Sequence, residues 1–83
     1  MNEMLITVRF FASYAESLGL AKTELALDSG SRVSDVLESI ARFPGAAALP
    51  KNPRVAVNHV FADADTILQT GDEVAFIPPV AGG

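Results

Sequence analysis

The sequence contains no cysteine and only one histidine, and these shortages exclude several kinds of active site. Without a thiol the chain has no disulfide, no cysteine zinc site and no thiolate nucleophile. A single histidine cannot build a metal centre, so we expect no bound metal. His59 falls in a predicted turn without a neighbouring partner, which favours an ordinary surface residue over a general base. A standalone enzyme is the least favoured class, because no nucleophile and base pair is available.

Basic residues and long apolar runs are also scarce. Six Lys and Arg stand against ten Asp and Glu, which gives a formal net charge of −4. The six are scattered between Arg9 and Arg54 and form no basic face, so we expect no nucleic-acid partner. No apolar run approaches the ~18 residues of a membrane span, and residues 1–4 lack the positive charge of a secretory signal. We therefore expect a cytoplasmic protein without membrane contact.

About half of the chain is nevertheless apolar, which indicates a folded domain. Hydrophobic residues make up 49% of the 83 positions and charged residues 19%, a composition outside the disordered range. A chain of this length forms one small domain, in which about 60% of the unfolded surface can be buried. We place this domain at residues 1–77 and an extended tail at residues 78–83.

Hydrophobic periodicity predicts two strands and a short helix in the first part of the chain. Alternation over residues 4–11 predicts a strand whose even-numbered residues, 6–10, face the core. Alternation over residues 23–28 predicts an antiparallel partner for it. Ser13 and the glutamate three residues later form a capping box, which opens a helix that Gly19 closes.

The main helix is predicted from an apolar stripe that runs from Val33 to Ile40 with the i, i+3, i+4, i+7 spacing. We expect Ser31 to cap this helix and Asp35 to lie in its first turn. Arg42 is expected in its last turn, and Pro44-Gly45 is expected to end it.

Residues 44–53 are predicted to form a loop, and short strands follow at residues 54–58, 60–61 and 73–77. Two strands, a helix and then short strands around a single core describe an α+β domain. The simplest arrangement is the β-grasp (ubiquitin-like) fold, a mixed sheet packed on one main helix. In this fold the last strand lies beside the first and parallel to it.

Parallel pairing brings the ends of the first and last strands together. We therefore expect Phe11 and Ile77 to form an exposed apolar pair on the face away from the helix, with Ala75 and Ala56 on the same face. We predict that this face docks a partner, and ordinary exposed apolar residues are the alternative. Burial of a few hundred Å² at roughly 25 cal/mol per Å² would offset the entropy of ordering the tail.

The acidic residues of the second half favour turns over cation sites. Asp63 and Asp65 lack the remaining oxygen ligands and the glycine of a calcium loop. Asp72 and Glu73 also fit a turn. Contact between these two acids and basic residues of a partner is the alternative.

The main functional signal is the last six residues, Pro78-Pro79-Val80-Ala81-Gly82-Gly83. The pattern Pro-Pro-x-x-Gly-Gly at a chain end is expected by chance on the order of once in a hundred thousand chains. Each proline fixes φ and lacks an N–H, so the strand should end at Ile77 and the chain should continue extended. The six residues span roughly 20 Å when fully drawn out, enough to carry the terminal carboxylate into another protein. A frayed end is the alternative.

Three stretches of the sequence resemble one known family: Phe10-Phe11-Ala12, Val55-Ala56-Val57-Asn58, and GDEVAFIPPVAGG from Gly71 to Gly83. Together they resemble the small subunit of molybdopterin synthase, the MoaD family of sulfur carriers, over nearly the full chain. Thiamine sulfur carriers and ubiquitin-like modifiers share the fold and the Gly-Gly end but seldom the Asp-Glu-Val-Ala-x-x-Pro-Pro run. Family members commonly have an arginine where this chain has Ala15, so any partner contact made through that arginine is left open.

The resemblance implies that Gly83 is the reactive residue of a sulfur-transfer cycle in molybdenum cofactor biosynthesis. An E1-like enzyme would use ATP to adenylate its carboxylate, and a persulfide sulfur would replace AMP. The resulting thiocarboxylate would enter the large synthase subunit and sulfurate cyclic pyranopterin monophosphate. The resemblance also implies a heterotetramer, no permanently bound cofactor and no activity of the carrier alone. Partner binding would involve Phe11, Ala75, Ile77, Pro78, Pro79, Val80, Ala81 and Gly82.

Three other functions remain open at the level of sequence. A ubiquitin-like modifier would end in an isopeptide bond to a target lysine. A thiamine-pathway carrier would pair with a thiazole synthase. A plain interaction domain would lose nothing when Gly83 is deleted.

Overall fold

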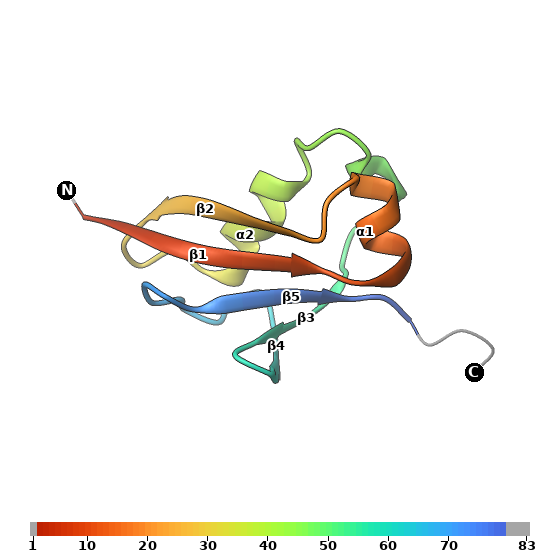
Figure 1. The fold of residues 1–83 in the computed structure, drawn as a ribbon. Coiled ribbons are helices and arrows are strands. Elements are labelled where there is room, and N and C mark those ends of the chain that lie inside the picture. The colour runs from red at the N-terminus through yellow and green to blue at the C-terminus, as the bar shows by residue number, and fades with distance from the viewer. Residues whose placement is uncertain (1, 80–83) are drawn as a thin grey trace.

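The computed structural model describes residues 2–79, and its strands form one mixed sheet (Figure 1). The elements are β1 (Glu3–Phe10), α1 (Ala12–Leu18), β2 (Lys22–Asp28), α2 (Val33–Ile40), the 3-10 helix η1 (Ala46–Ala48), β3 (Arg54–Val57), β4 (Val60–Ala62) and β5 (Glu73–Ile77). The strand order is β2-β1-β5-β3-β4. β1 pairs antiparallel with β2 and parallel with β5, while β3 pairs antiparallel with β5 and β4. The predicted β-grasp arrangement, with the last strand beside the first, is confirmed.

The core lies between one face of this sheet and the helices. Alternate residues of β1 point into it, so Ile6 and Val8 are fully buried and Phe10 is 2% exposed. Phe10 packs against Phe76 of β5, with the two ring centroids 5.2 Å apart. The predicted apolar stripe of α2 closes the core from the other side, since Val33–Ile40 contributes buried residues at both of its ends. Burial of these side chains supplies the main driving force for folding.

The start of α1 differs from the prediction. Its N-cap is Phe11, in an extended conformation, and the helix begins at Ala12, so Ser13 is not the cap. The backbone oxygen of Phe11 accepts the N–H groups of Tyr14 and Ala15 at 3.0 and 3.4 Å. The chain therefore turns directly out of β1 into the helix, and this places Ser13 inside the first turn. Gly19 closes the helix in the left-handed conformation, as predicted.

The ends of α2 also lie elsewhere than predicted. Ser31 is not the cap, because its N–H donates to Asp28 and its C=O accepts from Leu68, which ties it to a turn and a neighbouring segment. The N-cap is Arg32, whose N–H donates to Oδ2 of Asp35 at 2.8 Å. Asp35 thus lies in the first turn as expected. The helix ends at Ile40, so Arg42 falls beyond its last turn.

At Gly45, between α2 and the sheet, the chain passes very close to the backbone of α1. The segment predicted as loop contains η1, which packs beside α1. Gly45 has a φ of +86°, and a Cβ at this position would collide with the backbone oxygen of Ser17. Only glycine satisfies both the backbone conformation and the available space.

The turn between β3 and β4 fixes the register of one sheet edge. Asn58 and His59 have φ values of 50° and 74°, which two-residue hairpin turns of type I′ require. Nδ2 of Asn58 donates to Oδ1 of Asp72 at 3.0 Å, and Oδ1 of Asn58 accepts the backbone N–H of Glu73 at 3.0 Å. These bonds fasten the hairpin to the beginning of β5.

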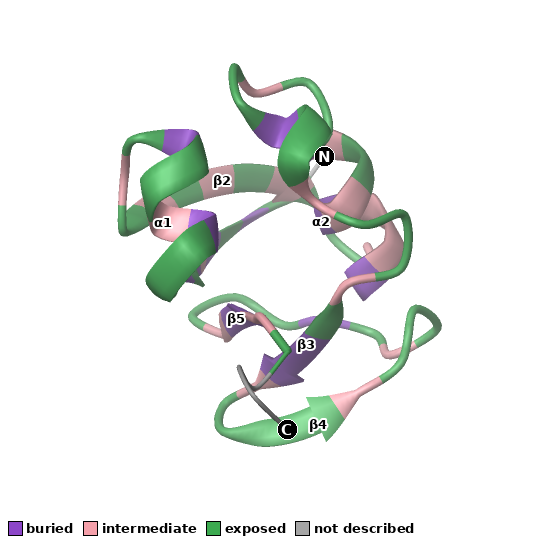
Figure 2. Cartoon of the chain, turned by 90° about the vertical axis from the view of Figure 1, so that its right-hand side faces the viewer, coloured by how far each residue is buried: buried purple, intermediate pink, exposed green. Residues whose placement is uncertain are grey.

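The strand boundaries differ from the predicted ones by at most one residue at either end, and β5 spans Glu73–Ile77 as predicted. In Figure 2, β4 at the edge of the sheet is largely exposed. Within residues 2–79, the helices are all too short or too polar to cross a membrane.

Candidate functional site

The sheet face opposite the helices brings the predicted docking residues together. Strand register pairs Arg9 with Ala75, Ala75 with Ala56, and Ala56 with Phe61. These four residues therefore form one row across β1, β5, β3 and β4. Because side chains alternate along a strand, Ile77 shares this face with Ala75.

A hollow of about 260 Å³, called here the apolar socket, lies over this row. Ala56 and Ala75 form its floor, and each is 7% exposed. Phe11, 42% exposed, and Phe61, 64% exposed, stand at its rim together with the half-buried Ile77. Small residues below and large apolar residues around them make the socket a concave hollow with an apolar floor.

The predicted neighbours do meet at the end of β5. Phe11, Ile77, Ala75 and Ala56 all line the apolar socket. Ile77 is half-buried rather than fully exposed, so Phe11 is the more accessible member of the pair. The part of these residues in partner binding stays a prediction.

The two prolines lie beside a second hollow, of about 440 Å³, at the end of β5. Pro78 is half-buried and Pro79 is exposed. Tyr14, Pro53 and Arg54 line the same hollow. The remaining predicted site residues, Val80, Ala81, Gly82 and Gly83, lie outside the described residues. The division of the chain at residue 77 and the reactive role of Gly83 stay predictions.

Two arginines flank the apolar socket. Cζ of Arg9 lies 5.8 Å from the ring centroid of Phe11, and Cζ of Arg54 lies 5.2 Å from that of Phe61. Both distances are within the range of cation–π attraction. Nη1 of Arg9 also forms a long ion pair, 3.8 Å, with Oε1 of Glu73. The surroundings of the socket thus hold two arginines and one carboxylate, whereas the whole chain carries a net charge of −4.

The sequence prediction missed Phe61, Arg9 and Arg54 as parts of this site. The Asn58-His59 pair is the signal that would have found Phe61, because a two-residue turn places Ala56 opposite Phe61. The arginines are harder to find, since their positions depend on which strands become neighbours in the sheet.

The other candidate residues behave as turn and surface residues. His59 is exposed in the hairpin turn and lines the edge of the apolar socket. Oδ1 of Asp63 accepts the N–H of Asp65 and the hydroxyl of Thr66, at 3.1 and 3.3 Å. Oδ2 of Asp72 accepts the N–H of Gln69 at 2.8 Å. Within residues 2–79, His, Asp and Glu form no group of three or more that could hold a metal ion. Asp63 and Asp72 stabilise turns, as the sequence predicted, whereas Glu73 is the first residue of β5. Contact of Asp72 and Glu73 with a partner stays a prediction.

Ala15, where the related sequences commonly have an arginine, is part of the packing of α1. It is half-buried and packs against the hydrophobic core beside α1. Ala15 therefore contributes packing in this chain.

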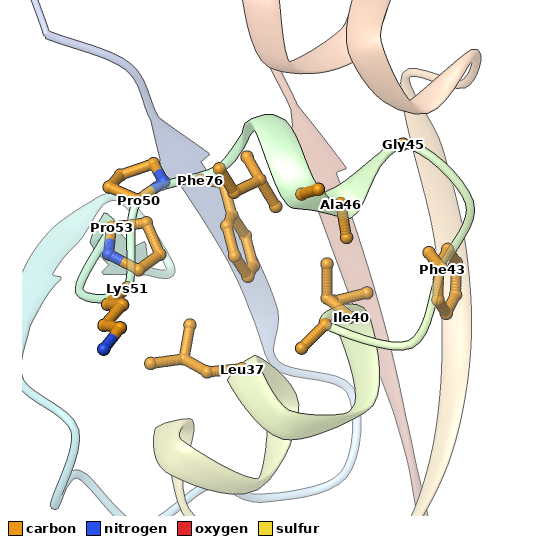
Figure 3. A pocket seen from close by; sticks show the side chains of 12 residues that line it. Leu37, Ile40, Phe43, Gly45, Ala46, Pro50, Lys51, Pro53 and Phe76 are labelled. Atoms are coloured by element: carbon orange, nitrogen blue, oxygen red, sulfur yellow. The ribbon is translucent and has the colours of Figure 1, made fainter.

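A further hollow, of about 520 Å³, lies on the helix side of the sheet (Figure 3). It is bounded by the end of α2, the segment that carries Gly45 and Pro50, and Phe76 of β5. Lys51 is the one charged residue among those described that line it. The hollow therefore offers apolar surface but no set of groups for acid–base or metal chemistry.

Known proteins are similar to this chain over nearly its whole length. The sequence model of the ThiS family matches residues 8–83. The molybdopterin synthase sulfur carrier subunit of Escherichia coli (strain K12) is 38% identical over 82 residues, which cover 95% of this chain and 100% of that protein.

Two solved structures have the same fold. The crystal structure of SAMP1 from Haloferax volcanii superposes with a TM-score of 0.84 at 26% identity, and the match covers 95% of this chain and 99% of that one. A complex of subunits 1 and 2 of the molybdopterin-converting factor from Helicobacter pylori 26695 contains a chain that matches with a TM-score of 0.70 at 23% identity. That match covers 96% of this chain and 100% of the other.

Proposed function

Because the chain belongs to the ThiS family and is related to molybdopterin synthase sulfur carrier subunits, we propose that it is the sulfur-carrier small subunit of molybdopterin synthase. Its partner in this function is the large subunit of the synthase. The related fold in a complex of two molybdopterin-converting factor subunits supports a partner of this kind.

The proposed chemistry takes place at the C-terminal carboxylate of Gly83. A carboxylate is a poor electrophile, so an E1-like enzyme first joins it to AMP and releases pyrophosphate from ATP. A persulfide sulfur then attacks the carbonyl carbon and displaces AMP, and a thiol cleaves the remaining S–S bond to leave the thiocarboxylate. The thiocarboxylate sulfur is a soft nucleophile, which is transferred to cyclic pyranopterin monophosphate in the large subunit.

The observation that carries this proposal is the position of Pro78 and Pro79, with which the Pro-Pro-x-x-Gly-Gly sequence begins, relative to the apolar socket. β5 ends at Ile77, which lines the socket, and the two prolines follow at once. A partner that covers the socket is therefore placed beside the root of the tail. Docking of the body and delivery of Gly83 then belong to one binding event, in which burial of apolar surface offsets the ordering of the tail.

The groups present in the chain determine what the carrier contributes to the reaction and what its partners must contribute. The carrier brings the sulfur, and the partners bring the acid–base groups, ATP and the persulfide. We propose that the chain holds no permanent cofactor, works in the cytoplasm, has no activity alone and forms a heterotetramer with the large subunit.

A second function is favoured by one observation. SAMP1, whose structure superposes on this chain, is a small archaeal modifier protein. As a modifier the chain would use the same adenylated glycine but would end in an isopeptide bond to a lysine of a target.

Intact mass spectrometry tests the proposed function. The chain is incubated with ATP, an E1-like activating enzyme and a sulfur source, with a variant that lacks Gly83 as the control. We expect the full chain to gain the mass of one oxygen exchanged for one sulfur, localised to the C-terminal peptide, and the control to stay unchanged. Conjugates to lysine without any thiocarboxylate would instead favour the modifier. Capture of a thiazole synthase in place of the large subunit would favour the thiamine-pathway carrier.

A further inference from the structure

Arg9 lines the apolar socket, and Arg54 lies diagonally across from it, in the lining of the neighbouring hollow that shares Phe61 and Ile77 with the socket. Arg9 on β1 lies beside Ala75 of β5, and Arg54 on β3 lies opposite Ile77 of β5, two residues further along the same strand. β1 and β3 are the two neighbours of β5 in the sheet. Strand spacing and rise place the two arginine backbones roughly 12 Å apart, with the socket between them.

Both arginines are exposed at the socket, so their guanidinium N–H groups are accessible to a partner. Each lies over an aromatic ring at the socket rim, Arg9 over Phe11 and Arg54 over Phe61. A planar guanidinium presents its N–H groups as a fork that binds a carboxylate with two parallel bonds. Among residues 2–79, no carboxylate lies within ion-pair distance of Arg54, and the pair between Arg9 and Glu73 is long, at 3.8 Å.

Docking on the apolar socket changes the surroundings of these charges. A partner that covers Phe61 also covers the guanidinium of Arg54 beside it and removes water from that group. A desolvated charge without a counter-charge strongly opposes binding, whereas a paired charge is tolerated or stabilises the complex. The surface that fits this face must therefore bring its own acid. A second copy of this chain meets that need poorly on this face, because it would present two arginines and one carboxylate, Glu73, which already pairs with Arg9.

We propose that the docking partner places an apolar side chain in the socket and carboxylates against Arg54 and Arg9, with Arg54 as the stronger contact. This inference rests on the proposed function, in which the partner is the large subunit of molybdopterin synthase. It adds the chemistry of the partner surface: an apolar centre between acidic residues.

Calorimetric titration of the cognate large subunit with the full chain tests this inference at low and at high salt. We expect Arg54→Glu to weaken binding about tenfold or more, because a repulsion replaces a charge pair. Arg54→Gln should weaken binding less, and Arg9→Glu should have a smaller effect than Arg54→Glu. Arg42→Glu is the matched control, since it makes the same change of charge at an exposed position outside the socket. It should bind within about twofold of the natural chain. Salt should weaken binding of the natural chain more than binding of Arg54→Glu.

Equal binding of the natural chain, Arg54→Glu and Arg9→Glu would overturn the inference, and so would an equal loss in Arg42→Glu. Self-association of the chain alone that Arg54→Glu abolishes would also overturn it, in favour of a second copy as the occupant. Thermal unfolding shows whether each variant is folded, and Arg54→Gln provides the comparison if the charge reversal unfolds the chain. Formation of the Gly83 thiocarboxylate without any arginine effect would defeat this inference alone. If the natural chain does not bind the large subunit at all, the proposed function and the inference fail together.

Discussion

Replacement of Phe61 by alanine should separate partner affinity from the stability of the domain. Phe61 is 64% exposed at the rim of the apolar socket. A phenylalanine buries about 150–250 Å², so roughly 100–160 Å² of this residue is left for a partner to cover. At roughly 25 cal/mol per Å² this surface is worth about 2.5–4 kcal/mol, of which alanine keeps a part. We therefore expect Phe61→Ala to lose about 2–3 kcal/mol of binding free energy, a Kd roughly 30 to 150 times higher.

Folding stability should change far less in this variant. The lost interactions within the domain are limited to an exposed ring and its contact with Arg54, about 1 kcal/mol at most. Calorimetric titration against the large subunit and thermal unfolding measure the two effects separately. Val60→Ala is the matched control, because Val60 is 68% exposed on the same strand but points to the opposite face. Unchanged binding of Phe61→Ala, or an equal loss in Val60→Ala, would refute the assignment of this face as the docking surface.

Three more predictions follow from the described contacts. Ile77→Asp should abolish measurable docking in the same titration, because it places a carboxylate in the wall of the apolar socket, and unchanged affinity would show that the partner docks elsewhere. Gly45→Ala should destabilise the domain by about 2–5 kcal/mol in thermal unfolding, since it adds steric overlap to an unfavourable φ. Gly30→Ala has a positive φ but open space and should lose only about 1–2 kcal/mol, so equal losses would contradict the proposed clash. Asn58→Ala should lose about 1–3 kcal/mol in the same assay, as it removes the bonds to Asp72 and Glu73, and an unchanged midpoint would contradict their role.

Periodicity predicted the fold well because burial dominates the choice of strand and helix faces. Alternation assigned Ile6, Val8 and Phe10 to the core. Because helices cover only one face of the sheet, a shift of one residue would expose all three side chains, so only one register is stable. The parallel pairing of the first and last strands followed from the order of elements, since few connections are allowed between them. Both predictions depend on patterns spread over many residues, so single substitutions or turns do not disturb them.

Helix caps were predicted less well because they depend on local backbone paths. Ser13 has the residue type of a cap, yet the chain leaves β1 so sharply that Phe11 takes the position. Ser31 likewise has a suitable side chain, but its backbone is used by a turn and by Leu68. A residue type alone does not show which backbone groups are already engaged.

The residues around the apolar socket were predicted in part. The pairing of the first and last strands predicted Phe11, Ala75 and Ile77. Arg54 and Phe61 were missed because they belong to β3 and β4, which lie on the other side of β5. The charge pattern around the socket arises only when side chains from β1, β3, β4 and β5 are placed together. It is a property of the sheet order rather than of any one segment.

Single-turnover sulfur transfer tests the central claim most directly. The chain with a thiocarboxylate at Gly83 is mixed with the large subunit and cyclic pyranopterin monophosphate, and the intact mass of the chain is followed with time. We predict that the chain returns to the mass of the carboxylate as the pterin gains sulfur, and that Ile77→Asp slows this exchange strongly. A chain that keeps its sulfur in the complete mixture, or loses it equally fast without the large subunit, would contradict the account.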